Sequence, residues 1–219
     1  MKNLSLNIKK FIFSRKCCIC NEVMKKDSEE YICSKCSFKL ETLGKLKSRK
    51  GVYFSFHYEE IKSLIWDFKF SNRKYISKEI AKFIKEPLNE LIKELGIDVV
   101  IPVPISDTRM RERGFNQVEE FLKECNIKYE TIERAKNTKH MYEIDSIEKR
   151  KENLVSVFKG NLNLHDKKIL LVDDIVTTGS TIEEIKKELK SYNKTIEIFI
   201  FSLSVVRSYL KNKTNDGVK

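Results

Sequence analysis

The stretch KILLVDDIVTTGST, residues 168–181, constrains the fold of this chain more than any other. After the first lysine, apolar residues follow one another without a break, which is typical of a strand buried on both faces of a parallel sheet. Two aspartates come next, Asp173 and Asp174, and then a glycine among hydroxyl side chains. Helical periodicity begins at residue 180. The stretch therefore predicts a buried strand, a loop and a helix start.

Similar alternation of strand and helix patterns extends over most of the chain. The expected strands are 51–58, 98–104, 168–172 and 195–205. The expected helices are 59–70, 75–95 with a break near Pro87, 107–124, 145–155 and 180–192, after a short helix or arm at 1–14. Strands that alternate with helices predict an α/β fold with a doubly wound, mainly parallel sheet. Ligands of such sheets bind beyond the carboxyl ends of the strands.

That rule places the two aspartates in a ligand crevice at the rim of the sheet, where the strand is expected to end. Carboxylates there can accept hydrogen bonds from sugar hydroxyls or hold a hydrated Mg²⁺. The loop after them offers backbone N–H groups and the positive end of a helix, which are the parts of a monophosphate site. Its residues are Thr177, Thr178, Gly179, Ser180 and Thr181. We therefore predict a site for a phosphorylated sugar, with an ordinary capped turn as the alternative.

The segment LLVDDIVTTGST resembles the phosphoribosyl pyrophosphate (PRPP) signature of type I phosphoribosyltransferases. The resemblance implies that Asp173 and Asp174 bind the ribose hydroxyls, that the loop 177–181 binds the 5′-phosphate, and that Mg²⁺ accompanies PRPP. Three arginines, Arg109, Arg111 and Arg113, follow another predicted strand. A guanidinium can bind two phosphate oxygens at once, so these arginines are candidates for binding the pyrophosphate of PRPP. A solvated helix start is the alternative.

Together with PVPIS, RERGFNQ and IEKRKENLVSVF, this signature resembles the competence protein F (ComF) family. These are phosphoribosyltransferase-like proteins linked to DNA uptake in natural transformation. The resemblance covers nearly the whole chain. Arg150 and Asn153 match an element of the family, whereas His140 stands where the family usually has a glutamine. The role of the loop around His140 is therefore left open.

Four cysteines form two pairs with the spacing of a zinc site. They are Cys17, Cys20, Cys33 and Cys36. Each CxxC pair can supply two thiolates to a tetrahedral Zn²⁺, and disulfides are disfavoured in a reducing cytosol. We predict a structural zinc site, with Cys18 outside it and Cys125 as a lone thiol in or near the core. Tyr31 and Phe38 are expected to be core aromatics of this segment, with stacking on nucleic-acid bases as the alternative.

The net charge of +11 is concentrated near the ends of the chain. The first 50 residues carry 13 Lys and Arg against 5 Asp and Glu. This excess fits either a segment that contacts a polyanion or a solvated basic surface, and the lysines partly offset the charge of four thiolates. The longest apolar stretch, 196–206, is too short and too interrupted to span a membrane, and no signal peptide is recognisable. A cytoplasmic protein is expected.

These observations predict a basic zinc-binding module at 1–50 and a phosphoribosyltransferase-like domain at 51–219. Two functions are compatible with them. An enzyme would transfer ribose 5-phosphate from Mg²⁺-PRPP to a nucleophile with release of pyrophosphate. A non-catalytic protein would sense PRPP or a nucleotide, while its zinc module contacts single-stranded DNA or a protein of the DNA-uptake machinery. No residue identifies itself as the base that would activate an acceptor.

Overall fold

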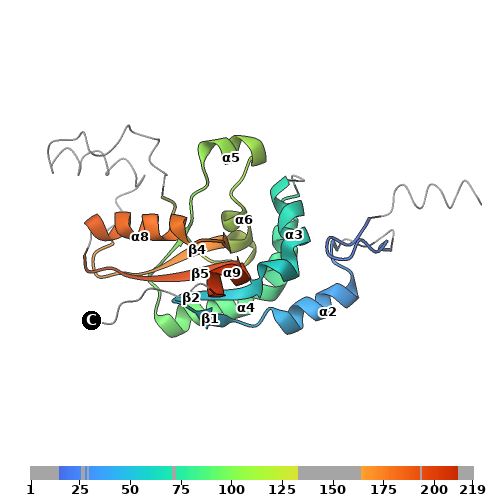
Figure 1. Ribbon diagram of the computed structural model, residues 1–219, viewed down its shortest axis with the longest axis horizontal. Coiled ribbons are helices and arrows are strands. Elements are labelled where there is room, and N and C mark those ends of the chain that lie inside the picture. Colours follow the sequence, from blue (N-terminus) through green and yellow to red (C-terminus); the bar gives the residue numbers. More distant parts are fainter. Residues whose placement is uncertain are drawn as a thin grey trace, which may run out of the picture.

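A computed structural model of the protein describes residues 15–25, 28, 30–70, 73–132, 164–192 and 194–211. Its elements are, in chain order, α2 (Ser34–Leu43), β1 (Lys47–Arg49), β2 (Val52–His57), α3 (Tyr58–Phe70), α4 (Ile76–Leu95), β3 (Val99–Pro102), α5 (Asp107–Arg113), α6 (Gln117–Glu124), β4 (Lys168–Val176), α8 (Ser180–Tyr192), β5 (Glu197–Val205) and α9 (Arg207–Lys211) (Figure 1). The arm predicted at 1–14, the helix predicted at 145–155, and the residues His140, Arg150 and Asn153 lie outside the described residues.

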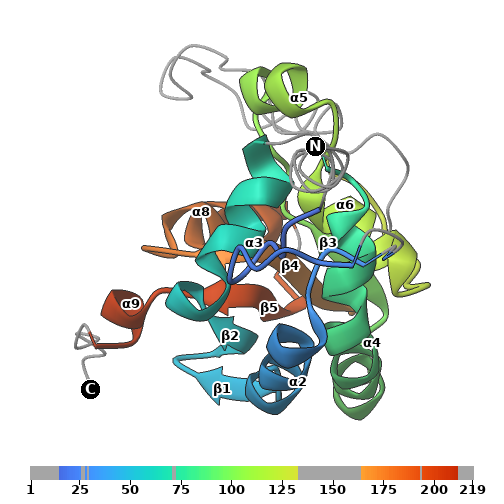
Figure 2. The same cartoon turned by 90° about the vertical axis from the view of Figure 1, so that its right-hand side faces the viewer.

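The five described strands form one sheet in the order β1-β2-β5-β4-β3. The pairs β2–β5, β5–β4 and β4–β3 are parallel, and only the short edge strand β1 runs antiparallel to its neighbour. Helices cover both faces of the sheet, with α8 on one face and α4 on the other (Figures 1 and 2). The predicted α/β class with a doubly wound, mainly parallel sheet is confirmed.

Alternate residues of β4 contribute to two separate buried clusters. Leu170 and Val172 belong to the cluster that contains the apolar faces of α3, α4 and α6. Ile169 and Leu171 belong to the cluster that contains the apolar face of α8. This division follows from the period of two along a strand, which sends neighbouring side chains to opposite faces of the sheet.

The predicted break at Pro87 is wrong, because α4 runs without interruption from Ile76 to Leu95. Proline removes one backbone donor and normally kinks or ends a helix. The apolar face of α4 compensates for this loss, since Ile80, Ile84, Leu88 and Leu91 are each at most 1% exposed. Burial of one such side chain contributes roughly 1.5–3 kcal/mol, so four of them outweigh a single missing hydrogen bond.

The single helix predicted over 107–124 is in fact two helices, α5 and α6. Gly114 ends α5 in the left-handed region at φ 75°, and its N–H donates to Met110 O at 2.8 Å. Asn116 then begins α6, with its side chain accepting a hydrogen bond from the N–H of Val118 at 3.0 Å. Glycine after a helix end and asparagine before a helix start are the residues that these positions favour.

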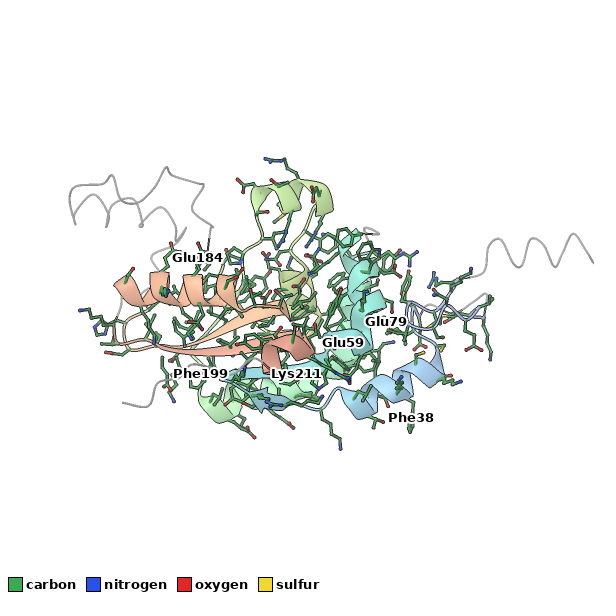
Figure 3. The ribbon with its side chains drawn as sticks, in the orientation of Figure 1. Phe38, Glu59, Glu79, Glu184, Phe199 and Lys211 are labelled. Carbon is green, nitrogen blue, oxygen red and sulfur yellow. The ribbon has the colours of Figure 1, made fainter. Side chains whose placement is uncertain are left out.

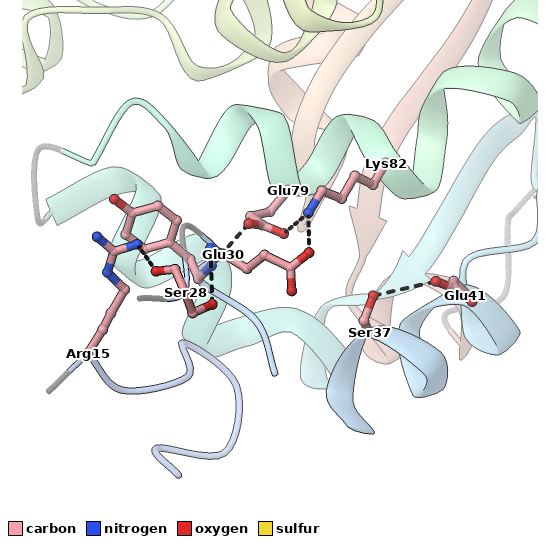
Figure 4. Close-up of polar contacts among 8 residues, drawn as sticks. Arg15, Ser28, Glu30, Ser37, Glu41, Glu79 and Lys82 are labelled. Carbon is pink, nitrogen blue, oxygen red and sulfur yellow. Dashed lines mark hydrogen bonds and ion pairs between the residues drawn. The ribbon is translucent and has the colours of Figure 1, made fainter. Parts of the chain in front are cut away.

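The cysteine-bearing segment packs against α3 and α4. Cys17, Cys18 and Ile32 belong to the same buried cluster as the apolar residues of those helices. Glu79, on α4, is 5% exposed, and its carboxylate accepts a hydrogen bond from the backbone N–H of Tyr31 at 3.0 Å. Lys82 pairs with Glu79 at 3.0 Å and with Glu30 at 3.2 Å (Figure 4). The division into domains at 1–50 and 51–219 stays a prediction.

Replacing Glu79 by alanine should lower the free energy of unfolding by about 2–3 kcal/mol, because the partly buried N–H of Tyr31 loses its acceptor. Glu30 provides a matched control, since it pairs with the same Lys82 but its side chain is 55% exposed. Glu30→Ala should cost less than about 1 kcal/mol. Urea unfolding of both variants measures the difference, and equal losses would contradict a role for Glu79 in holding the cysteine segment.

The two aromatic residues of this segment differ in their surroundings. Tyr31 is partly buried and stacks on Tyr75, with ring centroids 4.2 Å apart. Phe38 is 72% exposed on α2, so its prediction as a core residue is wrong (Figure 3). Phe38 lies on the face of α2 opposite Cys36 and Leu40, which are the buried residues of that helix.

Among the described helices, none combines the length and the apolar character that crossing a bilayer requires.

Candidate functional site

The two neighbouring aspartates lie within β4, close to its carboxyl end, and not after it. Asp173 is paired with Ser202 of β5, and the pairing continues to Val176 opposite Val205. The predicted strand end at residue 172 is therefore wrong. The strand is longer because β5 runs beside it as far as Val205 and supplies partners for its backbone groups.

Asp173 and Asp174 have different surroundings, because successive side chains of a strand point to opposite faces of the sheet. Asp174 forms an ion pair with Lys69 of α3 at 2.6 Å, and both side chains are about four-fifths or more buried, at 16% and 15% exposed. Asp173 lines a pocket together with residues 175–182. Its Oδ1 also accepts a hydrogen bond from the N–H of Asp174 at 2.8 Å.

Burial and, after it, the neighbouring charge of Asp174 raise the pKa of Asp173, which is about 7. The hydrogen bond from the N–H of Asp174 and the positive charges of Lys69 and Arg109 act in the opposite direction. Asp173 is therefore a carboxyl group that titrates near neutral pH in a site open to solvent on one side. Burying a carboxylate lowers the stability of the folded protein and raises the pKa of the group. Groups with such shifted pKa values are concentrated at functional sites.

The loop between β4 and α8 forms the rest of the pocket, which opens to solvent. Its five predicted residues all line the pocket: Thr177, Thr178, Gly179, Ser180 and Thr181. The hydroxyls of Thr178 and Ser180 lie 2.9 Å apart, and the N–H of Ser180 donates to Thr178 Oγ1 at 3.3 Å. The loop leads directly into the positive N-terminal end of α8.

Gly179 is required in this loop for two reasons. Its φ of +79° lies in the left-handed region, which side chains disfavour. In addition, a Cβ at this position would lie 3.0 Å from Cε2 of Tyr209 on α9. The ring of Tyr209 therefore closes one side of the loop, and Lys50 holds α9 in place by donating to Tyr209 O at 2.9 Å.

Replacing Gly179 by alanine should destabilise the protein by about 2–3 kcal/mol, since the left-handed backbone costs about 1–2 kcal/mol and the ring of Tyr209 must also move. Gly96 is a matched control. Its φ is +63°, but a Cβ there would meet nothing within 4 Å, so Gly96→Ala should show only the backbone cost. Urea unfolding measures both variants, and identical losses would refute the contact with Tyr209.

Two of the three predicted arginines lie near the aspartates. Arg113 lies over the ring of Phe70 at 5.5 Å and donates from Nη1 to Gln117 Oε1 at 2.9 Å. Burial lowers its pKa, and the charge of Asp174 counteracts this. The charge of Arg109 likewise acts on Asp173. Arg111 is exposed and, at a spacing of two residues, lies on another face of α5.

Lys69 and Tyr209 are part of this site but cannot be recognised in the sequence. Lys69 ends an ordinary amphipathic helix, and Tyr209 lies in a helix of five residues. Each reaches the site from a distant part of the chain, so no local pattern connects it with residues 173–181.

The four predicted cysteine ligands form one cluster. Their sulfur atoms all lie within 4.8 Å of one another, and Cys20 Sγ and Cys33 Sγ are 3.8 Å apart. Zn–S bonds of ~2.3 Å in a tetrahedron would place sulfur atoms ~3.8 Å apart, so the cluster could hold such an ion. No other group of three or more His, Cys, Asp or Glu side chains in the described part of the chain is close enough to hold a metal.

The surroundings of Cys17 suit a thiolate, whereas burial raises the pKa of Cys36. Burial raises the pKa of Cys17, but backbone N–H groups, including those of Ile19 and Cys33, lower it to about 7. Cys18 lies outside the cluster, and burial beside Asp67 raises its pKa to about 12. Cys125 is 1% exposed in the main core, as predicted. Both of these thiols are therefore protonated at neutral pH.

Comparison with known proteins gives a consistent result. The family model for the phosphoribosyl transferase domain matches residues 76–215. The chain is 29% identical to competence protein ComFC of Streptococcus pneumoniae over 215 residues, covering 80% of this chain and 93% of that protein. It is 29% identical to competence protein F of Haemophilus influenzae, covering 64% of this chain and 66% of that protein. It is also 30% identical to DNA utilization protein YhgH of Escherichia coli, covering 58% of this chain and 59% of that protein.

Proposed function

Since the chain belongs to the phosphoribosyl transferase domain family and is similar to ComF-type competence proteins, we propose that its pocket binds PRPP. The observation that carries this proposal is the junction of β4 and α8. One carboxylate with a raised pKa and a loop of hydroxyls and backbone N–H groups line the same small pocket there. Asp173 would bind the ribose hydroxyls, and the loop 177–181 would bind the 5′-phosphate.

Asp174 would bind the ribose only if its ion pair with Lys69 were weakened or shared with the ligand. A ligand hydroxyl can share this carboxylate, because each oxygen accepts more than one hydrogen bond. Alternatively, Lys69 could turn toward the phosphates of the ligand and neutralise them. In both cases the carboxylate of Asp174 has a partner before PRPP arrives.

The pyrophosphate group would lie toward α5, where Arg109 and Arg113 approach the aspartates. Mg²⁺ would be held chiefly by phosphate oxygens of PRPP, since the two aspartates alone are a poor cage for this ion. In a transfer reaction, the bond between the ribose C1 and pyrophosphate breaks, and pyrophosphate leaves with the electron pair. The acceptor then forms a bond to C1 and loses its proton.

A test of this arrangement compares two arginines of the same helix. Arg113→Lys keeps the charge but loses the planar fork, so the affinity for Mg²⁺-PRPP should fall about tenfold. Arg111→Lys should leave the affinity unchanged, because Arg111 is exposed on another face of α5. Calorimetric titration measures both. Equal behaviour of the two variants would contradict the proposed pyrophosphate position.

Turnover is tested separately. Pyrophosphate release from PRPP in the presence of nucleobases, ammonia or single-stranded DNA would support a transferase. PRPP binding without release under all of these conditions would support the alternative, a non-catalytic sensor of PRPP in DNA uptake.

We further propose that the cysteine cluster binds one structural Zn²⁺. Four thiolates in a closed set leave no position for a substrate, which is typical of structural rather than catalytic zinc. The predicted contact between the basic module and single-stranded DNA or an uptake protein remains a prediction.

A further inference from the structure

Two large aromatic side chains are exposed side by side on α3. Trp66 is 57% exposed and Phe70 is 59% exposed. They are one helical turn apart, and their ring centroids are 4.5 Å from each other at an interplanar angle of 43°. Both rings thus form one continuous aromatic surface, here called the α3 platform. Neither ring is needed for the core, because the buried face of α3 consists of Ile61, Leu64, Ile65 and Phe68.

The surroundings of the α3 platform are basic. On a helix, the neighbours of Trp66 are the residues three and four positions away, and these are Lys62, Ser63, Lys69 and Phe70. None of these four is acidic. The carboxylate of Asp67, three positions before Phe70, is paired with Arg73 at 3.0 Å, and Lys69 is paired with Asp174. Arg113 of α5 adds a further positive charge, since its guanidinium lies 5.5 Å from the ring centroid of Phe70. In both views α5 lies beyond the end of α3 that carries Phe70 (Figures 1 and 2).

We propose that the α3 platform stacks the bases of single-stranded DNA while Lys62 contacts its phosphates. Aromatic rings that alternate with basic side chains on an open surface are the usual means of binding a single strand. A free nucleobase fits less well, because small ligands are held in concave pockets that bury most of their surface. The names of the relatives, competence protein and DNA utilization protein, agree with a nucleic-acid partner.

The platform adjoins the PRPP site without being part of it. Lys69, between Trp66 and Phe70 in sequence, forms an ion pair with Asp174. Arg113 lies over the ring of Phe70, and the charge of Asp174 acts on the pKa of Arg113. A strand on the platform would therefore pass beside the pocket. The proposal does not rest on PRPP binding, and it places the DNA contact on α3 instead of on the basic module.

Trp66 is the only tryptophan of the chain, so its fluorescence reports directly on the platform. Titration of the full-length protein with a thymidine oligonucleotide of about 20 nucleotides should quench this emission, since the indole stacks on a base. A duplex of the same length should quench it much less, because its bases are already stacked. Binding without any change in emission would overturn the proposal.

Trp66→Ala should weaken binding of a labelled oligonucleotide at least about tenfold, measured by fluorescence anisotropy. Phe38→Ala is the matched control, because Phe38 is an aromatic residue that is 72% exposed on α2, and it should bind as the wild type does. Wild-type affinity in Trp66→Ala, or an equal loss in Phe38→Ala, would overturn the proposal. So would a dimer that depends on Trp66, which would assign the platform to a second copy of the chain.

Two further measurements separate this proposal from the PRPP site. Trp66→Ala should bind PRPP and unfold as the wild type does, since its side chain is exposed. Asp173→Asn should keep its affinity for the oligonucleotide. Loss of PRPP binding in every protein tested would leave the DNA result intact, whereas loss of DNA binding in Asp173→Asn alone would count against a separate platform.

Discussion

Replacing Cys20 by serine should remove bound zinc and destabilise the protein by several kcal/mol. Cys20 is exposed, and without a metal its side chain would contribute little to folding. With Zn²⁺, the same substitution removes one of four ligands from a site whose binding energy is also folding energy, on the order of 10 kcal/mol in zinc-finger peptides. The loss should extend to α3 and α4, because the cysteine segment shares their core.

Cys18→Ala is the control for this prediction. Cys18 is 5% exposed but lies outside the cluster, so its replacement should cost about 1–2 kcal/mol and leave one zinc ion per chain. The order of the two effects is informative. If the protein binds metal, replacing the exposed Cys20 lowers its stability more than replacing the buried Cys18. If it binds no metal, the order of the two losses is reversed. Elemental analysis and urea unfolding of both variants distinguish the two cases.

Asp173→Asn should stabilise the free protein at pH 8, although it removes a residue of the proposed site. The pKa of Asp173 is raised from 3.8 to about 7 in the folded protein. Between these values the folded state binds more protons than the unfolded state, so stability falls as the pH rises, and above pH 8 the full loss is present. Asparagine does not ionise and can still accept the hydrogen bond from the N–H of Asp174. At about 1.4 kcal/mol per pKa unit, the gain at pH 8 is at most on the order of 4 kcal/mol.

The gain should shrink as the pH is lowered toward 4, where Asp173 is protonated in the folded protein. Asp174→Asn provides the opposite case, since it leaves the mostly buried Lys69 without its partner at 2.6 Å and should destabilise the protein by about 1–3 kcal/mol. Urea unfolding of both variants from pH 4 to pH 8 tests the difference. Destabilisation by Asp173→Asn at pH 8 would show that Asp173 is satisfied by internal contacts and not held for a ligand.

Much of the fold could be predicted from the sequence, because the strongest patterns are local. The uninterrupted apolar strand around Leu171 and the helix over 59–70 were each predicted from local patterns, and the structure confirms them. Three described elements were not predicted, and one of them, α2, has ten residues of which Cys36 and Leu40 are buried. β1 has three residues and α9 has five, so neither is long enough to establish a periodicity. At Pro87 packing of α4 overrode the local break signal of proline, whereas at Gly114 a cap interrupted the wider helical pattern.

The candidate site was predictable to the extent that it is contiguous in the chain. Residues 173–181 lie together because one strand, one loop and one helix start bring them together. The residues that tune the site come from elsewhere. Lys69 pairs with an aspartate 105 positions later in the chain, and Tyr209 closes the loop from α9. Such contacts depend on how α3 and α9 pack, and a single sequence carries no local signal for them.

The central claim, that the pocket between β4 and α8 binds PRPP, is tested most directly by calorimetric titration of the full-length protein with Mg²⁺-PRPP. We expect saturable binding at one site per chain in the wild type. We expect no measurable binding in the double variant Asp173→Asn/Asp174→Asn, after unfolding experiments have shown that the variant is folded. Absence of binding to the wild type, or undiminished binding to the folded double variant, would contradict the claim.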